Sequence, residues 1–155
     1  MQSKYGLART HHERGMTLTE AAISLVITAA LSVFLGTELQ AMADRVSLDT
    51  AVAEVLGDLR YARNLAVWER QAVQVAVDQA RPAVTIQRSG APAQPVGPTR
   101  DLTSRGVRSI RSTGGSLLSF SPRGTSATAT TLTLEDRRGA QRVVTVSLTG
   151  IVRAR

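Results

Sequence analysis

An apolar segment near the N-terminus is the feature that most constrains this chain. Residues Met16 to Leu35 read MTLTEAAISLVITAALSVFL, twenty residues with a single charge at Glu20. Twenty helical residues span about 30 Å, the thickness of the hydrocarbon core of a bilayer. Because basic residues precede the segment, the positive-inside tendency places the N-terminus in the cytoplasm. The segment therefore predicts a single-pass membrane protein whose remaining residues lie outside the cytoplasm.

Three other interpretations of this segment compete with the first. The segment can be a secretory signal cleaved after Ala41-Met42-Ala43, an uncleaved anchor, or a buried helix of a soluble protein. Its length is large for the apolar part of a secretory signal, and Glu20 lies inside its start. The basic flank and the length argue against a buried helix. A product that begins at residue 44 would identify the secretory signal.

Glu20 requires a partner if the segment lies in a membrane. An ionised carboxylate costs roughly 2.5–3.5 kcal/mol at the centre of a membrane helix, and less near an end. Cleavage between Gly15 and Met16 would create an α-ammonium group four residues before Glu20, in the same or a neighbouring subunit. Two unit charges about 4 Å apart attract by roughly 4 kcal/mol at an effective dielectric constant of 20. This pair would offset the desolvation of Glu20 and set the register between packed helices.

The residues around Gly15 carry a family resemblance. Arg14-Gly15-Met16-Thr17-Leu18-Thr19-Glu20, followed by an apolar run, resembles the class III signal of type IV pilins and pseudopilins. The resemblance implies that a prepilin peptidase removes residues 1–15 as a leader, cuts after Gly15 and N-methylates Met16, which stands where Phe is usual. It also implies that residues 16–40 form a transmembrane helix that enters the core of a filament, where Glu20 directs assembly.

The composition without this leader argues against catalysis. The two histidines, His11 and His12, and the single lysine, Lys4, all precede Gly15, and the chain has no cysteine. A chain that begins at Met16 therefore excludes histidine-based triads, Schiff-base lysines and zinc sites built from His or Cys. We expect no enzymatic activity, no metal, no cofactor and no small-molecule substrate.

The rest of the chain predicts a helix followed by strands. Apolar residues recur at three- and four-residue steps through Leu48, Val52, Val55, Leu59, Ala62 and Ala66. This pattern predicts an amphipathic helix that continues to about residue 70. Beyond it the apolar period becomes two, and strands are expected around 73–77, 84–86, 107–110, 117–120, 131–134 and 143–148, with a loop at 89–99 and a hairpin turn at 136–139. The predicted fold class is α+β: a long N-terminal helix packed on an antiparallel β-sheet head formed by residues 41–155.

Three short motifs in the head carry a second resemblance. The helical stretch DLRYARNLA at 58–66, the turn FSPRG at 120–124 and the strand end VSLTG at 146–150 are similar, in this order, to motifs of the GspH/FimT type of minor pseudopilin. The resemblance implies a pilin-like structural subunit of a type II secretion pseudopilus or a type IV pilus. Its partners would be prepilin peptidase, other pilins or pseudopilins, and the inner membrane.

Single residues of these motifs also have structural interpretations. Ala62 and Ala66 are expected to pack in the core, Pro122 and Gly124 to turn the chain, and Gly150 to allow a bend. The two arginines of the helical motif, Arg60 and Arg63, are expected in solvent or paired with Asp58. Trp68, the only tryptophan, is expected in the core between helix and sheet.

The charge distribution raises an alternative function. The formal net charge is +2 over residues 1–15, −4 over 16–80 and +9 over 81–155. An excess of this size can attract nucleic acid, and family members linked to DNA uptake carry a Gly-Arg-x-Arg tail. Here Gly150 is followed by an Arg-x-Arg displaced by two residues. The candidate contacts are Arg100, Arg105, Arg108, Arg111, Arg137, Arg138, Arg142, Arg153 and Arg155.

Two observations weigh against this alternative. Aromatic residues are few, so specific recognition of single strands by base stacking is not expected. The sequence from Met16 onward has sixteen Arg and no Lys, so Arg can also be simply the preferred surface cation of this chain.

Overall fold

The computed structural model describes residues 17–155, apart from the side chains of residues 34–38 and 41. Its contacts divide the chain into two compact units, Met1–Leu39 and Gln40–Arg155, which we call the N-terminal unit and the head. The helix α1 (Leu18–Glu69) contributes to both units. The predicted cleavage site, Gly15 and Met16, lies outside the described residues.

The helix α1 begins and ends at residues suited to these positions. The Thr17 hydroxyl accepts a hydrogen bond from the backbone N–H of Glu20 at 3.3 Å, which satisfies one of the donors left free at a helix start. Glu20 lies in the first turn, where a negative charge interacts favourably with the helix dipole. No proline interrupts the 52 residues of α1. After its last residue, Arg70 has a φ of 52°, the left-handed conformation that commonly terminates a helix.

In the N-terminal unit, α1 has an apolar surface. Its exposed large hydrophobic residues are Leu18, Ile23, Leu25, Val26, Ile27, Leu31, Val33 and Leu39. The hydroxyls of Ser24, Thr28 and Ser32 each donate to the carbonyl oxygen four residues earlier at 2.8 Å. These hydroxyls therefore present no unsatisfied donor to apolar surroundings. Among the residues that the structure describes, no helical segment is both long and apolar enough to cross a bilayer.

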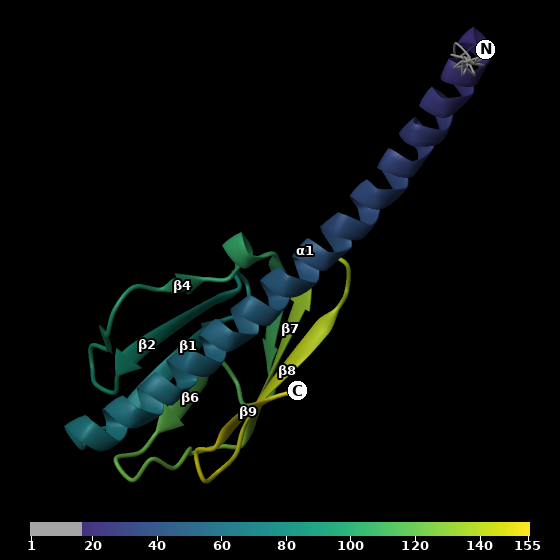
Figure 1. Cartoon of the computed structure of the whole chain (residues 1–155). Helices are drawn as coiled ribbons and strands as arrows, with labels where there is room; N and C mark the ends of the chain where they lie inside the picture. The colour runs from purple at the N-terminus through teal and green to yellow at the C-terminus, as the bar shows by residue number, and fades with distance from the viewer. Residues whose placement is uncertain (1–16) are drawn as a thin grey trace, which may run out of the picture. The chain divides into compact units, whose positions relative to one another are not determined.

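The head contains two antiparallel sheets, across which the second half of α1 lies (Figure 1). The strands are β1 (Val73–Asp78), β2 (Ala83–Arg88), β3 (Gln94–Pro95), β4 (Arg100–Asp101), β5 (Val107–Ser112), β6 (Leu117–Phe120), β7 (Thr130–Asp136), β8 (Gln141–Val146) and β9 (Val152–Ala154). The first sheet has the order β3–β2–β1–β6, with β4 also paired to β2, and the second has the order β5–β7–β8–β9. A short 3-10 helix, η1 (Thr103–Arg105), precedes β5.

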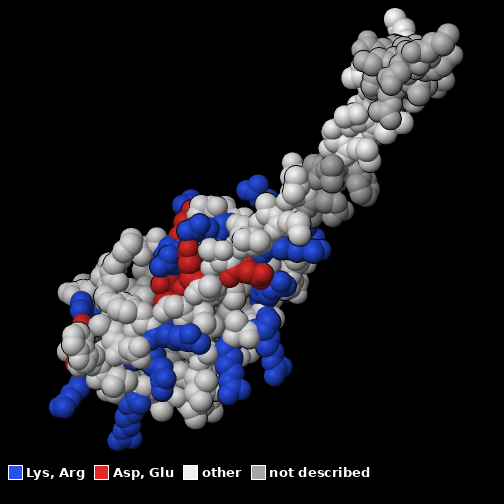
Figure 2. Space-filling model, in the orientation of Figure 1, with Lys and Arg blue, Asp and Glu red and all other residues white. Residues whose placement is uncertain are grey.

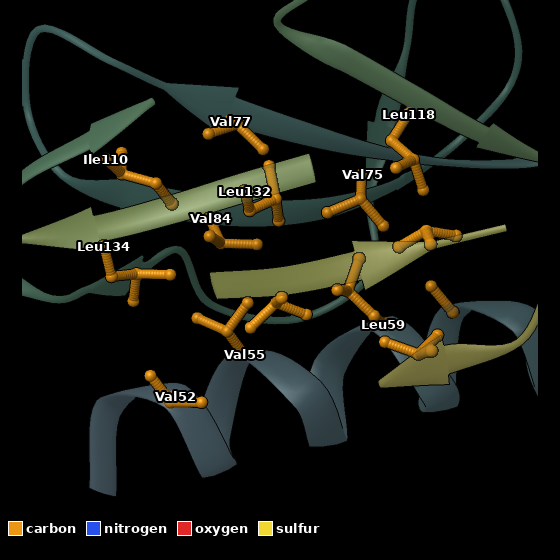
Figure 3. Close-up of a cluster of buried hydrophobic side chains, with 14 of the residues drawn as sticks. Val52, Val55, Leu59, Val75, Val77, Val84, Ile110, Leu118, Leu132 and Leu134 are labelled. Atoms are coloured by element: carbon orange, nitrogen blue, oxygen red, sulfur yellow. The ribbon is translucent and has the colours of Figure 1, made fainter. Parts of the chain in front are cut away.

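One hydrophobic core joins the helix to both sheets. Val55 and Leu59 point from α1 towards strand residues such as Val75 and Leu132 (Figure 3). The buried side of α1 consists of Leu48, Ala51, Val52, Val55, Leu59, Ala62, Leu65 and Ala66. The predicted apolar stripe is thus confirmed, including the packing of both alanines. In the described part of the chain, every buried hydrophobic residue lies between positions 48 and 152, so the head has a complete core and we expect it to fold without residues 1–39.

Most of the predicted strands are confirmed. The valines of β1 are buried at alternate positions, as a half-buried strand requires. The predicted hairpin turn joins β7 to β8, and Asp136 stabilises it because its Oδ1 accepts the backbone N–H groups of Arg138 and Ala140, each at 2.8 Å. Gly139 completes the turn with a φ of 84°. The predicted loop at 89–99 differs in one respect, since it contains the two-residue strand β3.

Two predictions about the head are wrong. The last strand does not continue to residue 148: β8 ends at Val146, Gly150 takes a φ of 75°, and the chain reverses into β9, which the sequence did not predict. The backbone N–H of Gly150 donates to the carbonyl oxygen of Ser147 at 2.8 Å and closes this turn. Trp68 is not in the core, because this residue is 88% exposed.

Candidate functional site

Acidic side chains of α1 pair with arginines from the sheets and loops of the head. Figure 2 shows the acidic side chains gathered along the helix with basic side chains beside them. The pairs are Asp44 with Arg138, Asp49 with Arg142, Glu54 with both Arg100 and Arg105, Asp58 with Arg100, and Glu69 with Arg88. The negative charge of the helix and the positive charge of residues 81–155 therefore neutralise each other in part within the head.

Two of these pairs, Arg88 with Glu69 and Arg100 with Asp58, are each joined by two hydrogen bonds. Arg88 donates from Nε and Nη2 to both carboxylate oxygens of Glu69, at 2.8 and 2.6 Å. This bonding lowers the pKa of Glu69 and raises the pKa of Arg88 from their ordinary values. Arg100 donates from Nη2 to Oδ1 of Asp58 at 2.9 Å, and this bonding raises the pKa of Arg100. The Arg100 side chain is 41% exposed, so solvent screening limits the pair to about 1 kcal/mol or less.

The ion pairs divide the predicted nucleic-acid contacts into two groups. Four of the nine arginines are paired with carboxylates of α1: Arg100, Arg105, Arg138 and Arg142. The other five are exposed and, within the described residues, lie in no ion pair: Arg108, Arg111, Arg137, Arg153 and Arg155. Contact of either group with nucleic acid stays a prediction.

The strand β9 brings two of the free arginines together. Arg153 lies in β9, and Arg155 extends its pairing, since its N–H donates to the carbonyl oxygen of Val143 at 2.8 Å. Residues two apart in a strand point to the same face. Both arginines line a groove of about 580 Å³ together with Thr131 and Thr145. Guanidinium groups and hydroxyls are suited to bind phosphate oxygens.

The three short motifs of the head meet at one point. Arg63 donates from Nε to the carbonyl oxygen of Gly124 at 2.9 Å. Gly150 packs so closely against this carbonyl that a Cβ added to it would lie 1.9 Å from the oxygen. The backbone N–H of Ser126 also donates to the carbonyl oxygen of Leu148 at 3.0 Å. We call this contact of Arg63, Gly124 and Gly150 the motif junction.

The motif junction settles the predictions for its residues. The prediction for Arg63 is wrong, because this residue is half-buried and holds Gly124, whereas Asp58 binds Arg100. Arg60 is exposed, as predicted. The expectation that Gly124 and Gly150 turn the chain is confirmed by their φ angles of 77° and 75°.

The predicted assembly residue lies in the N-terminal unit. Glu20 is exposed in the first turn of α1. Its expected partner, the amine that cleavage would create on Met16, lies outside the described residues. Within residues 17–155, no group of three or more His, Cys, Asp or Glu side chains is placed to hold a metal ion.

A family model connects this architecture to known proteins. The model described as "Type II transport protein GspH" matches residues 51–150, which are 100 of the 155 residues. The chain belongs to the GspH family. The match includes all three residues of the motif junction, so the contact among them lies in the part of the chain that follows the GspH pattern. No curated protein matches the chain.

Solved structures share the fold of this GspH-family chain. The type IV minor pilin FimU of Pseudomonas aeruginosa PAO1 is 22% identical, with a TM-score of 0.61 over 74% of this chain and 92% of FimU. The minor pseudopilin EpsH of the Vibrio cholerae type 2 secretion system is 17% identical, with a TM-score of 0.61 over 70% of this chain and 96% of EpsH. The predicted pilin-like α+β fold is therefore confirmed.

Proposed function

We propose that this GspH-family chain is a minor pseudopilin, a non-catalytic structural subunit of a type II secretion pseudopilus or a type IV pilus. The family match over the head, together with the Gly15-Met16 signal and Glu20 before an apolar helix, carries the proposal. Prepilin peptidase removes residues 1–15 and methylates the amine of Met16. Residues 16–40 then anchor the chain in the inner membrane, with the head on the periplasmic side, and other pilins or pseudopilins are its neighbours.

The surface of the N-terminal unit supports this proposal. Its exposed apolar side chains form a surface that lipid or neighbouring helices are expected to cover. Ser24, Thr28 and Ser32 are small, and their hydroxyls are already bonded to the backbone, so they let a second helix approach closely. Glu20 is exposed in the first turn and is available to an ammonium group of a neighbouring subunit.

Processing can be tested by mass analysis of the membrane-extracted full chain from cells with and without prepilin peptidase. We expect the peptidase to yield a chain that begins at Met16 and is one methyl group heavier. A product that begins at residue 44, or an intact leader in cells that have the enzyme, would contradict the proposal.

Assembly can be tested with two substitutions of Glu20. Glu20→Gln and Glu20→Leu remove the charge, so both variants should insert in the membrane and fail to enter filaments, as measured in sheared filament fractions. Ser24→Ala is the matched control, because it changes a polar residue one turn away without changing charge, and it should assemble normally. Normal assembly of either Glu20 variant would refute the electrostatic role of this residue.

A second candidate function, DNA binding in DNA uptake, is favoured by the β9 groove. Arg153 and Arg155 are exposed there beside four threonines, and within residues 17–155 they have no carboxylate partner. Contacts of this kind bind phosphates and carry little sequence information. We therefore expect binding to duplex DNA that does not depend on sequence.

This candidate can be tested by titrating the head with duplex DNA at several salt concentrations. We expect a dissociation constant of about 1–100 μM that rises steeply with salt. Changing both Arg153 and Arg155 to alanine should abolish binding, whereas Arg142→Ala, which removes an arginine already paired with Asp49, should not. Absence of binding at low salt would exclude the candidate.

A further inference from the structure

The end of α1 carries two features that packing of the head does not explain. Trp68 is the only tryptophan of the chain, and the residue is 88% exposed. Tryptophan is more frequent at binding surfaces than on other exposed surfaces. Two residues later, Arg70 has a φ of 52°, a left-handed conformation that favours glycine. The chain thus keeps a guanidinium group beside Trp68 at a position where glycine is the unstrained choice.

Trp68 lies in a groove rich in arginine. This groove, of about 640 Å³, is lined by Arg63, Asn64, Val67, Trp68, Arg70 and Arg123. The acidic neighbour in sequence, Glu69, is bound by Arg88 and does not line the groove. An exposed indole ring therefore shares this groove with three arginines and one asparagine.

The groove at Trp68 continues towards β9. An adjoining groove of about 340 Å³ shares Arg63 and Asn64 with it and adds Arg60 and Ile151. Ile151 also lines the β9 groove. These three grooves share lining residues, and we call them together the basic path; its arginines are Arg60, Arg63, Arg70, Arg123, Arg153 and Arg155. In the part of the chain that the structure describes, none of these six arginines lies within 4.0 Å of a carboxylate oxygen.

We propose that the basic path binds single-stranded nucleic acid, with a base stacked on Trp68 and phosphates bound by the surrounding arginines. Binding of single strands without sequence preference commonly combines these two elements, a positively charged groove and an aromatic ring on which a base can stack. The proposal extends the second candidate function to a new ligand class and a new contact, and it stands on Trp68, Arg70 and Arg123 rather than on the β9 arginines. A base in a duplex is already stacked, so the indole ring selects single strands.

The composition of the groove argues against a protein partner at the same place. Tryptophan and arginine are both enriched in protein interfaces, but the centre of such an interface is mostly apolar. Here Val67 is the single further hydrophobic residue that lines the groove with Trp68, and three of the six lining residues are arginines. A second copy of the head is also a poor partner, because five acids of its helix are already paired with its own arginines.

The fluorescence of Trp68 provides a direct test, since the head contains no other tryptophan. We expect an oligothymidylate of about 15 nucleotides to quench this fluorescence at low salt. The duplex of the same length should bind without comparable quenching. Polyglutamate, the probe for an acidic protein, should neither quench nor compete.

Anisotropy of a labelled oligothymidylate then measures the contribution of single residues. Trp68→Ala should weaken binding roughly 5- to 150-fold, whereas Trp68→Tyr should retain most of the affinity, because a phenol ring still stacks. Arg70→Gly should reduce the slope of log K against log salt by about 0.7, the contribution of one phosphate contact. This variant should fold normally, because glycine readily adopts the left-handed conformation of residue 70. The matched control, Arg138→Ala, removes an arginine already paired with Asp44 and should bind as the wild type does.

Three results would overturn the proposal. The first is wild-type affinity of Trp68→Ala for the single strand, and the second is equal quenching by duplex and single strand. The third is equal quenching by polyglutamate, which would instead assign the surface to an acidic protein. Changing both Arg153 and Arg155 to alanine distinguishes duplex binding at the β9 groove from single-strand binding at Trp68. This double variant should no longer bind duplex DNA, while single strands should still quench the fluorescence of Trp68.

Discussion

Replacing Gly150 by alanine perturbs the motif junction at its tightest contact. The added Cβ would lie 1.9 Å from the carbonyl oxygen of Gly124 and 3.0 Å from Nε of Arg63. Because the oxygen belongs to the backbone of a neighbouring turn, relief requires the two turns to separate, which strains the 2.9 Å bond that Arg63 donates to it. Overpacking of this kind costs typically 1–3 kcal/mol, and the left-handed conformation costs alanine about 1 kcal/mol more. We expect Gly150→Ala to lower the free energy of unfolding by about 3 kcal/mol.

Denaturant or thermal unfolding of the head measures this loss. A change of 1 kcal/mol shifts the Tm of a domain of this size by about 4 °C, so the variant should melt about 12 °C lower. Gly139→Ala is the matched control, because Gly139 has a φ of 84° but an added Cβ meets nothing within 4 Å. This control isolates the conformational cost of about 1 kcal/mol. Equal losses in the two variants would show that the approach of Gly150 to Gly124 contributes nothing and would refute the reasoning.

Three further substitutions test other parts of the head. Gly57→Ala should raise the free energy of unfolding by about 1 kcal/mol, because alanine favours the helix and its Cβ meets nothing within 4 Å; a lower midpoint in urea would contradict this. Trp68→Ala should change that free energy by less than about 0.5 kcal/mol, since the side chain is exposed, whereas loss of a core tryptophan costs about 3–5 kcal/mol. Arg88 holds the pKa of Glu69 below its ordinary value, so this carboxylate stabilises the head above the ordinary pKa of glutamate and loses that effect as the pH falls through the lowered pKa. The difference in stability between the wild type and Glu69→Gln should therefore shrink between about pH 7 and pH 3, and a constant difference would refute the role of the pair.

The helix and most strands could be predicted because their apolar periods are simple. The stripe from Leu48 to Ala66 has helical spacing, and the valines of β1 alternate, so each pattern has one favourable way to bury its residues. The same period predicts the exposure of Trp68. A residue two positions after the buried Ala66 stands about 200° from it around the helix axis. Trp68 was expected in the core because tryptophan is a large apolar residue, but its position on the helix places it in solvent.

The strand β9 was missed because the sequence before it does not show where β8 ends. Residues 143–148 continue an alternating pattern past the true end of β8, and Gly150 alone gives no sign of which way the chain turns. Local hydrogen bonds between Ser147 and residues 150 and 151 close the turn, and the folded chain adds the packing of Gly150 against Gly124, a contact between residues far apart in the sequence. The three motifs likewise had a recognisable order, but their meeting at Arg63 is a property of the folded chain.

The ion pairs determine which arginines are available to a ligand, and this division could not be read from net charge. Asp44, Asp49, Glu54 and Asp58 follow one another at intervals of four or five residues along α1, and together they bind Arg100, Arg105, Arg138 and Arg142. Along the helix, formal charge therefore overstates how strongly the head attracts a polyanion. The arginines of the basic path have no carboxylate partner among the described residues, so their charge remains available to a polyanion.

This division has a consequence for every binding experiment on the head. Added salt screens the exposed pairs along α1 as well as contacts with phosphates, because both are solvent-accessible. A binding constant that falls with salt thus reports phosphate contacts only if the head keeps its free energy of unfolding over the same range. Because the apolar core contains the helix and both sheets and does not depend on salt bridges, we expect it to do so. Unfolding curves recorded at each salt concentration of the titration show whether the head keeps its free energy of unfolding. A loss of stability that parallels the loss of affinity would remove the argument for phosphate binding.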